Sequence, residues 1–203
     1  MTMQRELFDI PESEGLQQDY LGVPGLGYYA ALLNESEQQQ ALEEVGSRSW
    51  KNDLKRQVQH YGYRYDYKTR TIDHSMHLGP LPDFANAIAK RLLDLDLVHE
   101  NPDQLIVNEY LPGQGIAPHI DCEPCFSDTI VTVSLGSAYE MDFISKTSQI
   151  RSALLEVGSV LILSGDARYK WMHRIRPRKA DRGVLRGRRV SLTYRKTIIN
   201  GAQ

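Results

Sequence analysis

The second half of the chain consists of short segments typical of β-strands, and this feature constrains the fold more than any other. These segments are short and β-branched or aromatic, and Gly, Pro, Ser or Asp separates them; they cover residues 104–111, 129–135, 139–144, 153–157, 160–163 and 190–198. Six or more strands this close together predict a sandwich or jelly roll. In such folds the inward-facing side chains alternate along each strand, and they can enclose a ligand between the sheets.

Two helices are expected before the strands. Asn34 is a suitable N-cap for a helix that runs to Val45 and ends at Gly46. A second helix is expected from Pro82 to Leu95, because its apolar residues are three or four positions apart. Helices followed by many strands predict an α+β fold in which the N-terminal helices support the strand layers.

The chain of 203 residues has the length of one domain, and we expect a loose leader over residues 1–20 and a single domain over residues 21–203. The first residues are polar, which excludes a secretory signal, and no apolar run approaches the roughly 18 residues of a membrane span. Two cysteines make a disulfide scaffold unexpected and favour a reducing cytosol. We therefore expect a cytoplasmic monomer without membrane contact.

A histidine and an acid stand two positions apart in the segment GIAPHIDCEPC, as His119 and Asp121. In extended backbone, residues i and i+2 point to the same side, so both can reach one ion. His173 is the preferred third ligand, because it follows the apolar segment 159–163 in aromatic surroundings. Two histidines and one carboxylate on one face are typical of a non-haem Fe(II) site with open positions. The alternative is a set of ordinary polar surface residues.

The same segment contains two cysteines three positions apart, Cys122 and Cys125. They are compatible with a redox pair, half of a zinc site, or two small residues in a loop. No second cysteine pair exists to complete a zinc site, and the βαβ context of a thioredoxin-like motif is missing. We expect an ordinary loop.

The last predicted strand carries polar residues at every second position. These are Arg189, Ser191, Thr193 and Arg195. If this face points inward, two buried arginines require an anionic partner, and their geometry suits a small dicarboxylate. Asn108 and Tyr110 share one face of an earlier strand and add an amide and a phenol. The alternative is an edge strand whose arginines face solvent.

Positive charge is concentrated near the C-terminus. Twelve of the 24 Lys and Arg residues lie between Arg168 and Lys196, together with one acid, Asp181. Such a cluster favours a polyanionic partner, most commonly nucleic acid. The alternative is a basic face that local acids balance. We expect phosphate contacts from its outward-facing members, namely Lys170, Arg174, Arg176, Arg178, Lys179, Arg182, Arg186 and Arg188.

Together these residues form the ordered pattern N-x-Y…H-x-D…H…R-x-[NS]-x-T-x-R, which resembles the AlkB family of Fe(II)/2-oxoglutarate dioxygenases. The similarity extends over residues 58–198 and includes the segments HYGYRYDY, NEYLPGQGIAPHID, SGDARYKWMHRIRPRK and RRVSLTYRK. Within the family, the pattern is most similar to the oxygenase domain of the vertebrate homologue that modifies a tRNA wobble uridine.

The resemblance implies a double-stranded β-helix (jelly roll) with His119, Asp121 and His173 as iron ligands and with 2-oxoglutarate and O2 as co-substrates. Arg189 and Tyr110 would hold the distal carboxylate of 2-oxoglutarate, and Arg195 and Asn108 would lie at its iron-proximal end. Ser191 departs from the asparagine that is common at its position, so its role in the cofactor site stays open.

The resemblance also implies a β-hairpin lid that recognises nucleotides, with Tyr63 and Tyr65 gripping the substrate strand. The bland alternative is a hairpin whose tyrosines pack its own core. Glu123 matches an acid that touches the substrate base in some repair members, which leaves the choice of base open.

Three functions are compatible with this interpretation. The first is oxidative demethylation of DNA or RNA, with single strands as the preferred partner; hydroxylation of a modified tRNA base is closely related to it. The second is oxidation of a protein or small molecule. The third is a silent binding module, against which the intact triad and both arginines count.

Overall fold

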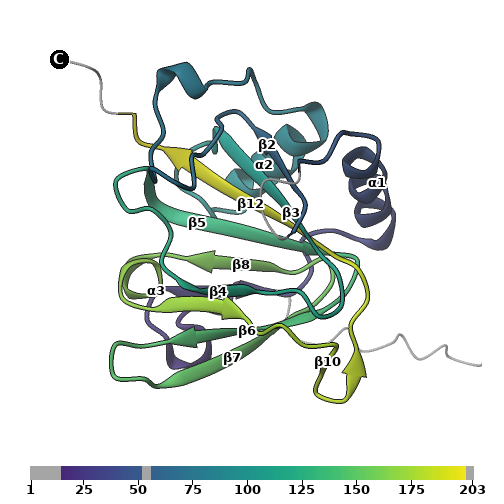
Figure 1. Cartoon of the computed structure of the whole chain (residues 1–203), viewed down its shortest axis with the longest axis vertical. Coiled ribbons are helices and arrows are strands. Elements are labelled where there is room, and N and C mark those ends of the chain that lie inside the picture. The colour runs from purple at the N-terminus through teal and green to yellow at the C-terminus, as the bar shows by residue number, and fades with distance from the viewer. Residues whose placement is uncertain (1–14, 52–55, 200–203) are drawn as a thin grey trace, which may run out of the picture.

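The computed structural model describes residues 15–51 and 56–199 of the chain (Figure 1). Its core consists of two antiparallel sheets that face each other. The larger sheet has the strand order β1-β8-β5-β12-β3-β2, and the smaller one has the order β4-β9-β6-β7. This is the jelly roll expected from the succession of short strands.

The larger sheet consists of β1 (Leu26–Tyr29), β8 (Val160–Leu163), β5 (Phe126–Leu135), β12 (Arg189–Thr197), β3 (Gln104–Tyr110) and β2 (Val58–Tyr61). The smaller sheet consists of β4 (Ile116–His119), β9 (Met172–Ile175), β6 (Tyr139–Ile144) and β7 (Ile150–Leu155). A separate short hairpin joins β10 (Ala180–Asp181) to β11 (Val184–Leu185).

Two helices, α1 (Glu35–Gly46) and α2 (Asp83–Asp94), support the outer face of the larger sheet (Figure 1). The predicted cap of α1 is confirmed: the Asn34 side chain accepts from the Glu37 amide, and the Glu37 carboxylate accepts from the Asn34 amide in return. Gly46 is the last residue of α1 and Ser47 caps it, so the helix extends one residue further than expected. Short helical turns lie at α3 (Gly165–Tyr169), Tyr20–Gly22 and His74–Met76.

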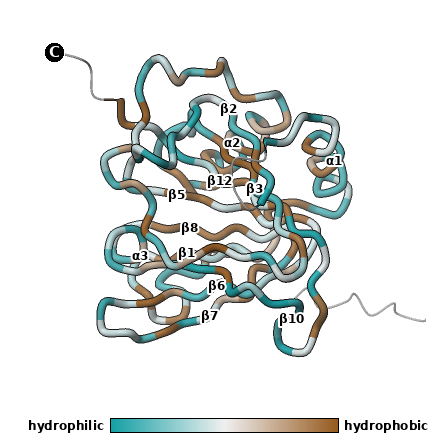
Figure 2. The backbone as a smooth tube through the Cα atoms, in the orientation of Figure 1, coloured by the Kyte–Doolittle hydropathy of each residue, from teal (hydrophilic) through white to brown (hydrophobic). Residues whose placement is uncertain are grey.

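Alternation along the strands divides the interior into two cores. In β12, the apolar residues Val190, Leu192 and Tyr194 pack with α1 and α2 in one core cluster. A second cluster contains Tyr110, Tyr139, Phe143 and Trp171 and lies between the two sheets. Hydrophobic residues follow β8 and β1 through this interior (Figure 2). Because β12 lies between β5 and β3, its polar face points into the space between the sheets. The prediction of an inward-facing polar strand is thus confirmed, and the edge-strand alternative is wrong.

The sequence missed β1, β2, β4 and β9, each of which has four residues, and the two-residue strands β10 and β11. The strand expected over residues 153–157 lies at Ile150–Leu155 instead. Residues 1–14 of the expected leader lie outside the described residues; within the rest of it, Leu16 packs against the core and Gln17 pairs with Tyr28. None of the helices in the described residues has the length and apolarity needed to cross a bilayer.

Candidate metal centre and cofactor pocket

The two histidines of the predicted triad lie directly opposite each other on paired strands. His119 ends β4 and His173 lies in β9, where the ladder pairs them at the same level. Their ring centroids are 4.2 Å apart. Asp121 lies two residues beyond β4, and its Oδ1 is 3.4 Å from Nε2 of His119. One ligand atom from each of the three residues lies within 4.8 Å of the others, so one ion can contact all three.

The electrostatics of the three residues suit a divalent cation. Burial alone raises the pKa of the Asp121 carboxyl, but Arg195 and the two histidines outweigh it and hold that pKa well below its usual range. Burial, and then His119, lower the pKa of His173 to about 3, so its imidazole is neutral. A carboxylate and neutral imidazoles are the protonation states that metal binding requires.

Arg195 holds the second oxygen of the aspartate. Its Nε and Nη2 atoms lie 3.1 and 2.9 Å from Oδ2 of Asp121, and its Nη1 atom donates to the Gln104 side chain. This fork leaves Oδ1 on the side of the histidines. In the described structure, Arg195 therefore binds the carboxylate of Asp121. A contact from Arg195 to 2-oxoglutarate would have to be made beside this ion pair.

Arg189 is a buried cation with vacant hydrogen-bonding capacity. Its side chain is fully shielded from solvent, and its Nη2 atom donates to Ser134 at 2.9 Å. Its Nε and Nη1 atoms have no hydrogen-bond partner among the described residues, and burial lowers its pKa to about 10. The guanidinium lies 5.6 and 6.0 Å from the ring centroids of Tyr110 and Tyr139. Unpaired buried donors on a cation are unfavourable, so they favour an anionic ligand at this point. This observation fits the carboxylate of 2-oxoglutarate.

The metal-binding triad and Arg189 line the same cavity, which has a volume of about 660 Å³. Its wall includes the predicted cofactor residues Asn108, Tyr110, Arg189, Ser191 and Arg195, and also Thr193. These residues are buried, whereas Pro118, Glu123, Met172 and Arg70 of the same wall are exposed. The cavity therefore extends from a solvent opening, past the triad, to a closed polar floor.

The sequence missed Arg56 and Tyr139 in this region. Nε of Arg56 donates to Oδ1 of Asn108 at 2.8 Å, and its guanidinium lies 5.5 Å from the centroid of Tyr110. The hydroxyl of Tyr139 donates to the main-chain oxygen of Gly187 at 3.0 Å, which secures the chain just before β12. The inward alternation of residues 139–143 could have indicated Tyr139; no signal indicated Arg56.

The lid, residues 62–77, supplies one of the two predicted tyrosines. It folds back on itself through two isolated antiparallel bridges, Tyr63 with His77 and Asp66 with Thr71. Tyr65 lines the cavity, as does Glu123. Tyr63 is not part of the lining and packs on His77 with 4.8 Å between ring centroids. Among the described residues, the geometry thus brings Tyr65 and Glu123 to the cavity but not Tyr63.

Tyr67 takes the second aromatic position. It lines the cavity, and its ring meets that of Tyr65 edge-on with 5.0 Å between centroids. Tyr63 and Tyr65 do not continue a regular strand, because β2 ends before Gly62, which has a φ of 74°. A Cβ there would lie 1.8 Å from the Asp103 carbonyl oxygen, so only glycine is tolerated at this turn.

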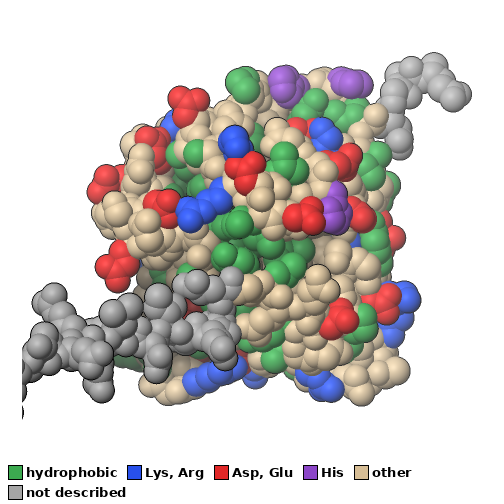
Figure 3. All heavy atoms as spheres, turned by 180° about the vertical axis from the view of Figure 1, so that it is seen from behind, with side chains coloured by type: hydrophobic (Ala, Val, Ile, Leu, Met, Phe, Trp, Pro, Cys, Tyr) green, Lys and Arg blue, Asp and Glu red, His purple; other side chains and the backbone are tan. Residues whose placement is uncertain are grey.

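The C-terminal arginines expected to contact phosphate are paired with acids instead. Cross-strand register places Arg174 opposite Asp142, at 2.8 Å between Nε and Oδ2. We define the outer arginine network as Arg174, Arg176, Arg178, Arg182 and Arg186 with Glu140, Asp142 and Asp181. Arg188 pairs with Glu109, and Lys170 with Asp166. The alternative of a basic face balanced by local acids is thus favoured over phosphate contact. On the described part of the face in Figure 3, positive and negative side chains are likewise interspersed.

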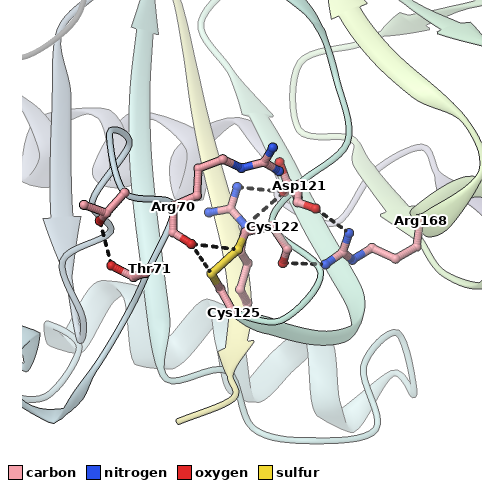
Figure 4. The surroundings of a disulfide bond; sticks show 8 residues. Arg70, Thr71, Asp121, Cys122, Cys125 and Arg168 are labelled. Carbon is pink, nitrogen blue, oxygen red and sulfur yellow. Dashed lines mark hydrogen bonds and ion pairs between the residues drawn. A yellow bond between two sulfur atoms is a disulfide. The ribbon is translucent and has the colours of Figure 1, made fainter. Parts of the chain in front are cut away.

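Cys122 and Cys125 form a disulfide, so the expectation of an ordinary loop is wrong (Figure 4). Both sulfur atoms lie 3.3 Å from the main-chain oxygen of Arg70 in the lid. The cysteines pack with Phe126, Tyr65 and Ile72. The disulfide therefore lies where the lid meets the turn that follows Asp121, and it forms part of a small apolar cluster there.

Comparison with known proteins agrees with this geometry. The model of the 2OG-Fe(II) oxygenase superfamily matches residues 25–195. The mouse protein named tRNA (carboxymethyluridine(34)-5-O)-methyltransferase ALKBH8 is 35% identical over 201 residues, which is 85% of this chain and 30% of that protein. The Arabidopsis thaliana protein named Alkylated DNA repair protein ALKBH8 homolog is 39% identical over 204 residues, 87% of this chain and 59% of that protein. This chain therefore spans less than two thirds of either relative.

AlkB of Salmonella typhimurium, named an alpha-ketoglutarate-dependent dioxygenase, is 28% identical over 159 residues, 76% of this chain and 70% of that protein. Among solved structures, OsALKBH1 superimposes with a TM-score of 0.67 at 20% identity, covering 89% of this chain and 99% of the other. A prolyl-4-hydroxylase from Pseudomonas putida gives 0.60 at 14% identity, covering 90% and 97%. These two structures share the fold. With the family match over most of its length, the chain belongs to the 2OG-Fe(II) oxygenase superfamily.

Proposed function

We propose that this enzyme oxidises alkyl groups on nucleic-acid bases and thereby demethylates damaged DNA or RNA. The main support for this proposal is that one cavity contains three features. These are the triad of His119, Asp121 and His173, the unpaired donors of Arg189, and an opening flanked by Tyr65 and Tyr67. The names of the relatives, which refer to DNA repair and to tRNA, support a nucleic-acid substrate.

Each group of residues has one task in this proposal. The triad would hold Fe(II), and Arg189 with Tyr110 would hold the distal carboxylate of 2-oxoglutarate. Asn108, Ser191 and Arg195 would complete the cofactor wall. Once bound, Fe(II) and 2-oxoglutarate supply the chemistry that places an oxygen atom from O2 into a C–H bond. A hydroxymethyl group on a base nitrogen then breaks down to formaldehyde and the free base.

The protein's own contribution is positioning. Arg195 keeps Asp121 ionised and turned toward the histidines. The buried floor of the cavity excludes water from the reacting groups. Tyr65 and Tyr67 offer ring surfaces on which an extruded base can stack, at about 1–3 kcal/mol per base. Because a paired base must first leave the duplex at a cost of about a few kcal/mol, single strands are the preferred substrate.

Phosphate contacts belong to the lid in this proposal rather than to the C-terminal arginines. Arg64, Lys68 and Arg70 are exposed cations of the lid, and none has an ion pair among the described contacts. The one acid between them, Asp66, accepts hydrogen bonds from the main-chain amides of Lys68 and Thr69. The lid thus combines aromatic rings with exposed positive charge, and one of its cations, Arg70, lines the cavity.

The second candidate is hydroxylation of a modified tRNA wobble base. The similarity to the mouse and Arabidopsis thaliana proteins, at 35% and 39% identity, favours it over a protein substrate. The same cavity and lid would serve it, and the product would keep the added oxygen.

The deciding experiment is mass spectrometry of nucleosides after incubation of the Fe(II)-loaded enzyme, 2-oxoglutarate and O2 with methylated single-stranded oligonucleotides or with bulk tRNA. Loss of one CH2 unit per lesion, with formaldehyde, is the expected result; gain of one oxygen on a tRNA nucleoside would establish the second candidate. The His119→Ala variant is the control. No change in either substrate, beside continued succinate formation, would overturn a nucleic-acid function.

Light scattering of the purified enzyme would test the accompanying proposal of a monomer, and imaging of a tagged chain would test its cytoplasmic location.

A further inference from the structure

The three triad residues are not held by the same kind of contact. His119 and His173 are fixed by the ladder between β4 and β9, in which they form one pair. Asp121 lies beyond the end of β4, in a stretch without regular secondary structure. The sheet therefore sets the spacing of the two histidines but leaves the main chain at Asp121 without ladder hydrogen bonds.

Arg168 supplies main-chain contacts at this point. Its Nη1 atom donates to the main-chain oxygen of Asp121 and its Nη2 atom to that of Cys122, each at 3.0 Å. Figure 4 shows this fork, with both donors directed at the turn after the aspartate. One planar guanidinium thus holds two consecutive carbonyl groups, which restrains both the position and the rotation of this turn.

The base of Arg168 is itself firmly anchored. It belongs to α3, where the Ala167 amide donates to the Pro24 oxygen at 2.8 Å and the Ser164 hydroxyl donates to the Gly25 oxygen at 3.0 Å. Gly25 approaches so closely that an added Cβ would lie 2.2 Å from the Ser164 oxygen. The segment that leads to His173 is therefore held by the two residues just before β1, and it can act as a rigid support.

Burying the Arg168 guanidinium also costs desolvation free energy. It is 2% exposed, its Nε atom has no partner, and no carboxylate among the described residues lies within ion-pair distance of it. A buried cation that contacts mainly carbonyl groups would be a poor choice if stability alone were needed, since an apolar side chain of similar size would pack there. Its fork geometry toward the turn after Asp121 gives it a use that an apolar residue cannot supply.

We propose that Arg168 is a positioning residue for the metal centre. It ties the segment that carries His173 to the turn after Asp121 and so fixes Asp121 as a ligand. Arg195 orients the carboxylate from its side-chain end, and Arg168 holds the main chain behind it. This inference rests on the metal site of the proposed function.

The role of Arg168 can be tested by measuring metal affinity in Arg168 variants and in a matched control variant. Residues that support metal ligands from behind typically change metal affinity by about 10- to 100-fold when replaced. We expect Arg168→Lys to weaken Mn(II) binding, measured by calorimetry with 2-oxoglutarate present, by about 10-fold, and Arg168→Met by up to about 100-fold. The visible spectrum of the Co(II)-loaded protein should change in both variants, because the aspartate ligand shifts.

Arg186→Lys is the control. Arg186 is equally buried and also donates to main-chain oxygens, those of Arg176 and Arg178, but it lies in the outer arginine network. Its replacement should lower the melting temperature of the metal-free protein while Mn(II) affinity stays within about twofold of wild type. If Arg168→Lys behaves like Arg186→Lys, losing stability with unchanged affinity and Co(II) spectrum, Arg168 is a structural brace only and the inference fails. If Arg168→Met does not fold, the lysine variant decides. If the wild-type protein itself binds no Mn(II), the proposed function fails as well.

Discussion

Two groups of arginines come from the same short stretch of sequence and have opposite surroundings. Those on the inner face of β12, Arg189 and Arg195, line the cavity, and two donors of Arg189 have no hydrogen-bond partner in the part of the chain that the structure describes. Those of the outer arginine network lie against the acids of β6 and the β10–β11 hairpin. Density of charge along the sequence therefore does not indicate where positive charge is available. Only the acids that lie opposite in space decide this.

The largest effect is expected from breaking the outer arginine network at its buried pair. Asp181→Ala would leave the fully buried side chain of Arg186 without its carboxylate, and we expect the free energy of unfolding to fall by about 3–5 kcal/mol. Urea denaturation measures this loss. Asp166→Ala removes the partner of the exposed Lys170 and should change stability by no more than about 1 kcal/mol. Equal losses in the two variants would mean that burial does not distinguish these pairs.

A nearly equal effect, on ligand binding rather than stability, is expected inside the cavity. Arg189→Met should weaken 2-oxoglutarate binding by about two orders of magnitude, since a buried charged hydrogen-bond partner contributes about 2–5 kcal/mol. Without ligand, the same variant should be more stable than wild type by about 1 kcal/mol or more, because an unpaired buried cation is removed.

Calorimetry and urea denaturation measure these two quantities. Arg188→Met, next in the chain but paired outside with Glu109, should leave 2-oxoglutarate affinity unchanged. A ligand-free Arg189→Met protein that is less stable than wild type would show that the guanidinium is already satisfied without a ligand.

The outer arginine network also predicts how stability responds to acid. Burial raises the pKa of the Glu140, Asp142 and Asp181 carboxyls, but hydrogen bonds from their arginines outweigh it and hold each pKa below its ordinary value. Groups with a depressed folded-state pKa stabilise the fold above their unfolded pKa and lose this contribution as the pH falls through the folded value.

We therefore expect the free energy of unfolding to fall steeply below about pH 4, the region of unperturbed carboxyl pKa values. Denaturation at pH values around 6, 4 and 3 measures it. Asp142→Asn should flatten the response, because one of the three titrating groups is gone. An unchanged slope in this variant would assign acid sensitivity to other carboxyls.

The smallest effect concerns the salt dependence of nucleic-acid binding, which we expect to depend on cations of the lid and not on those of the outer arginine network. Removing one cation that binds a phosphate should reduce the slope of log affinity against log salt concentration by about 0.7 for a single strand. Lys68→Ala or Arg70→Ala should each show such a reduction, whereas Arg182→Ala, whose side chain pairs with Glu140, should show none. Fluorescence anisotropy with a labelled single-stranded oligonucleotide measures the slopes. The reverse ranking would return phosphate binding to the C-terminal segment.

Alternation was the reliable signal in the sequence. It predicted the inward polar face of β12 and the shared face of Asn108 and Tyr110, because a central strand leaves each side chain only two directions. The same rule predicted that His119 and Asp121 could reach one ion. It gave no guide to the lid, because β2 ends before Gly62 and the chain then follows its own turns: Tyr65 lines the cavity, whereas Tyr63 packs on His77.

Contacts between distant segments could not be predicted in this way. Nothing in residues 168–188 indicates that Glu140 and Asp142 lie beside them, because this depends on the pairing of β6 with β9. Nor does the spacing of Cys122 and Cys125 indicate a disulfide, since the same spacing occurs in loops, metal sites and redox pairs. The support of Asp121 by Arg168 likewise depends on how α3 packs against β1.

The stoichiometry of the reaction on a methylated single-stranded oligonucleotide is the sharpest test of the proposed demethylation. We expect the Fe(II)-loaded enzyme, supplied with 2-oxoglutarate and O2, to form succinate and formaldehyde in equal amounts, at a rate that depends on the oligonucleotide, with neither product from His119→Ala. Succinate formed at the same rate with and without nucleic acid, and no formaldehyde, would contradict the assignment of this cavity to nucleic-acid demethylation.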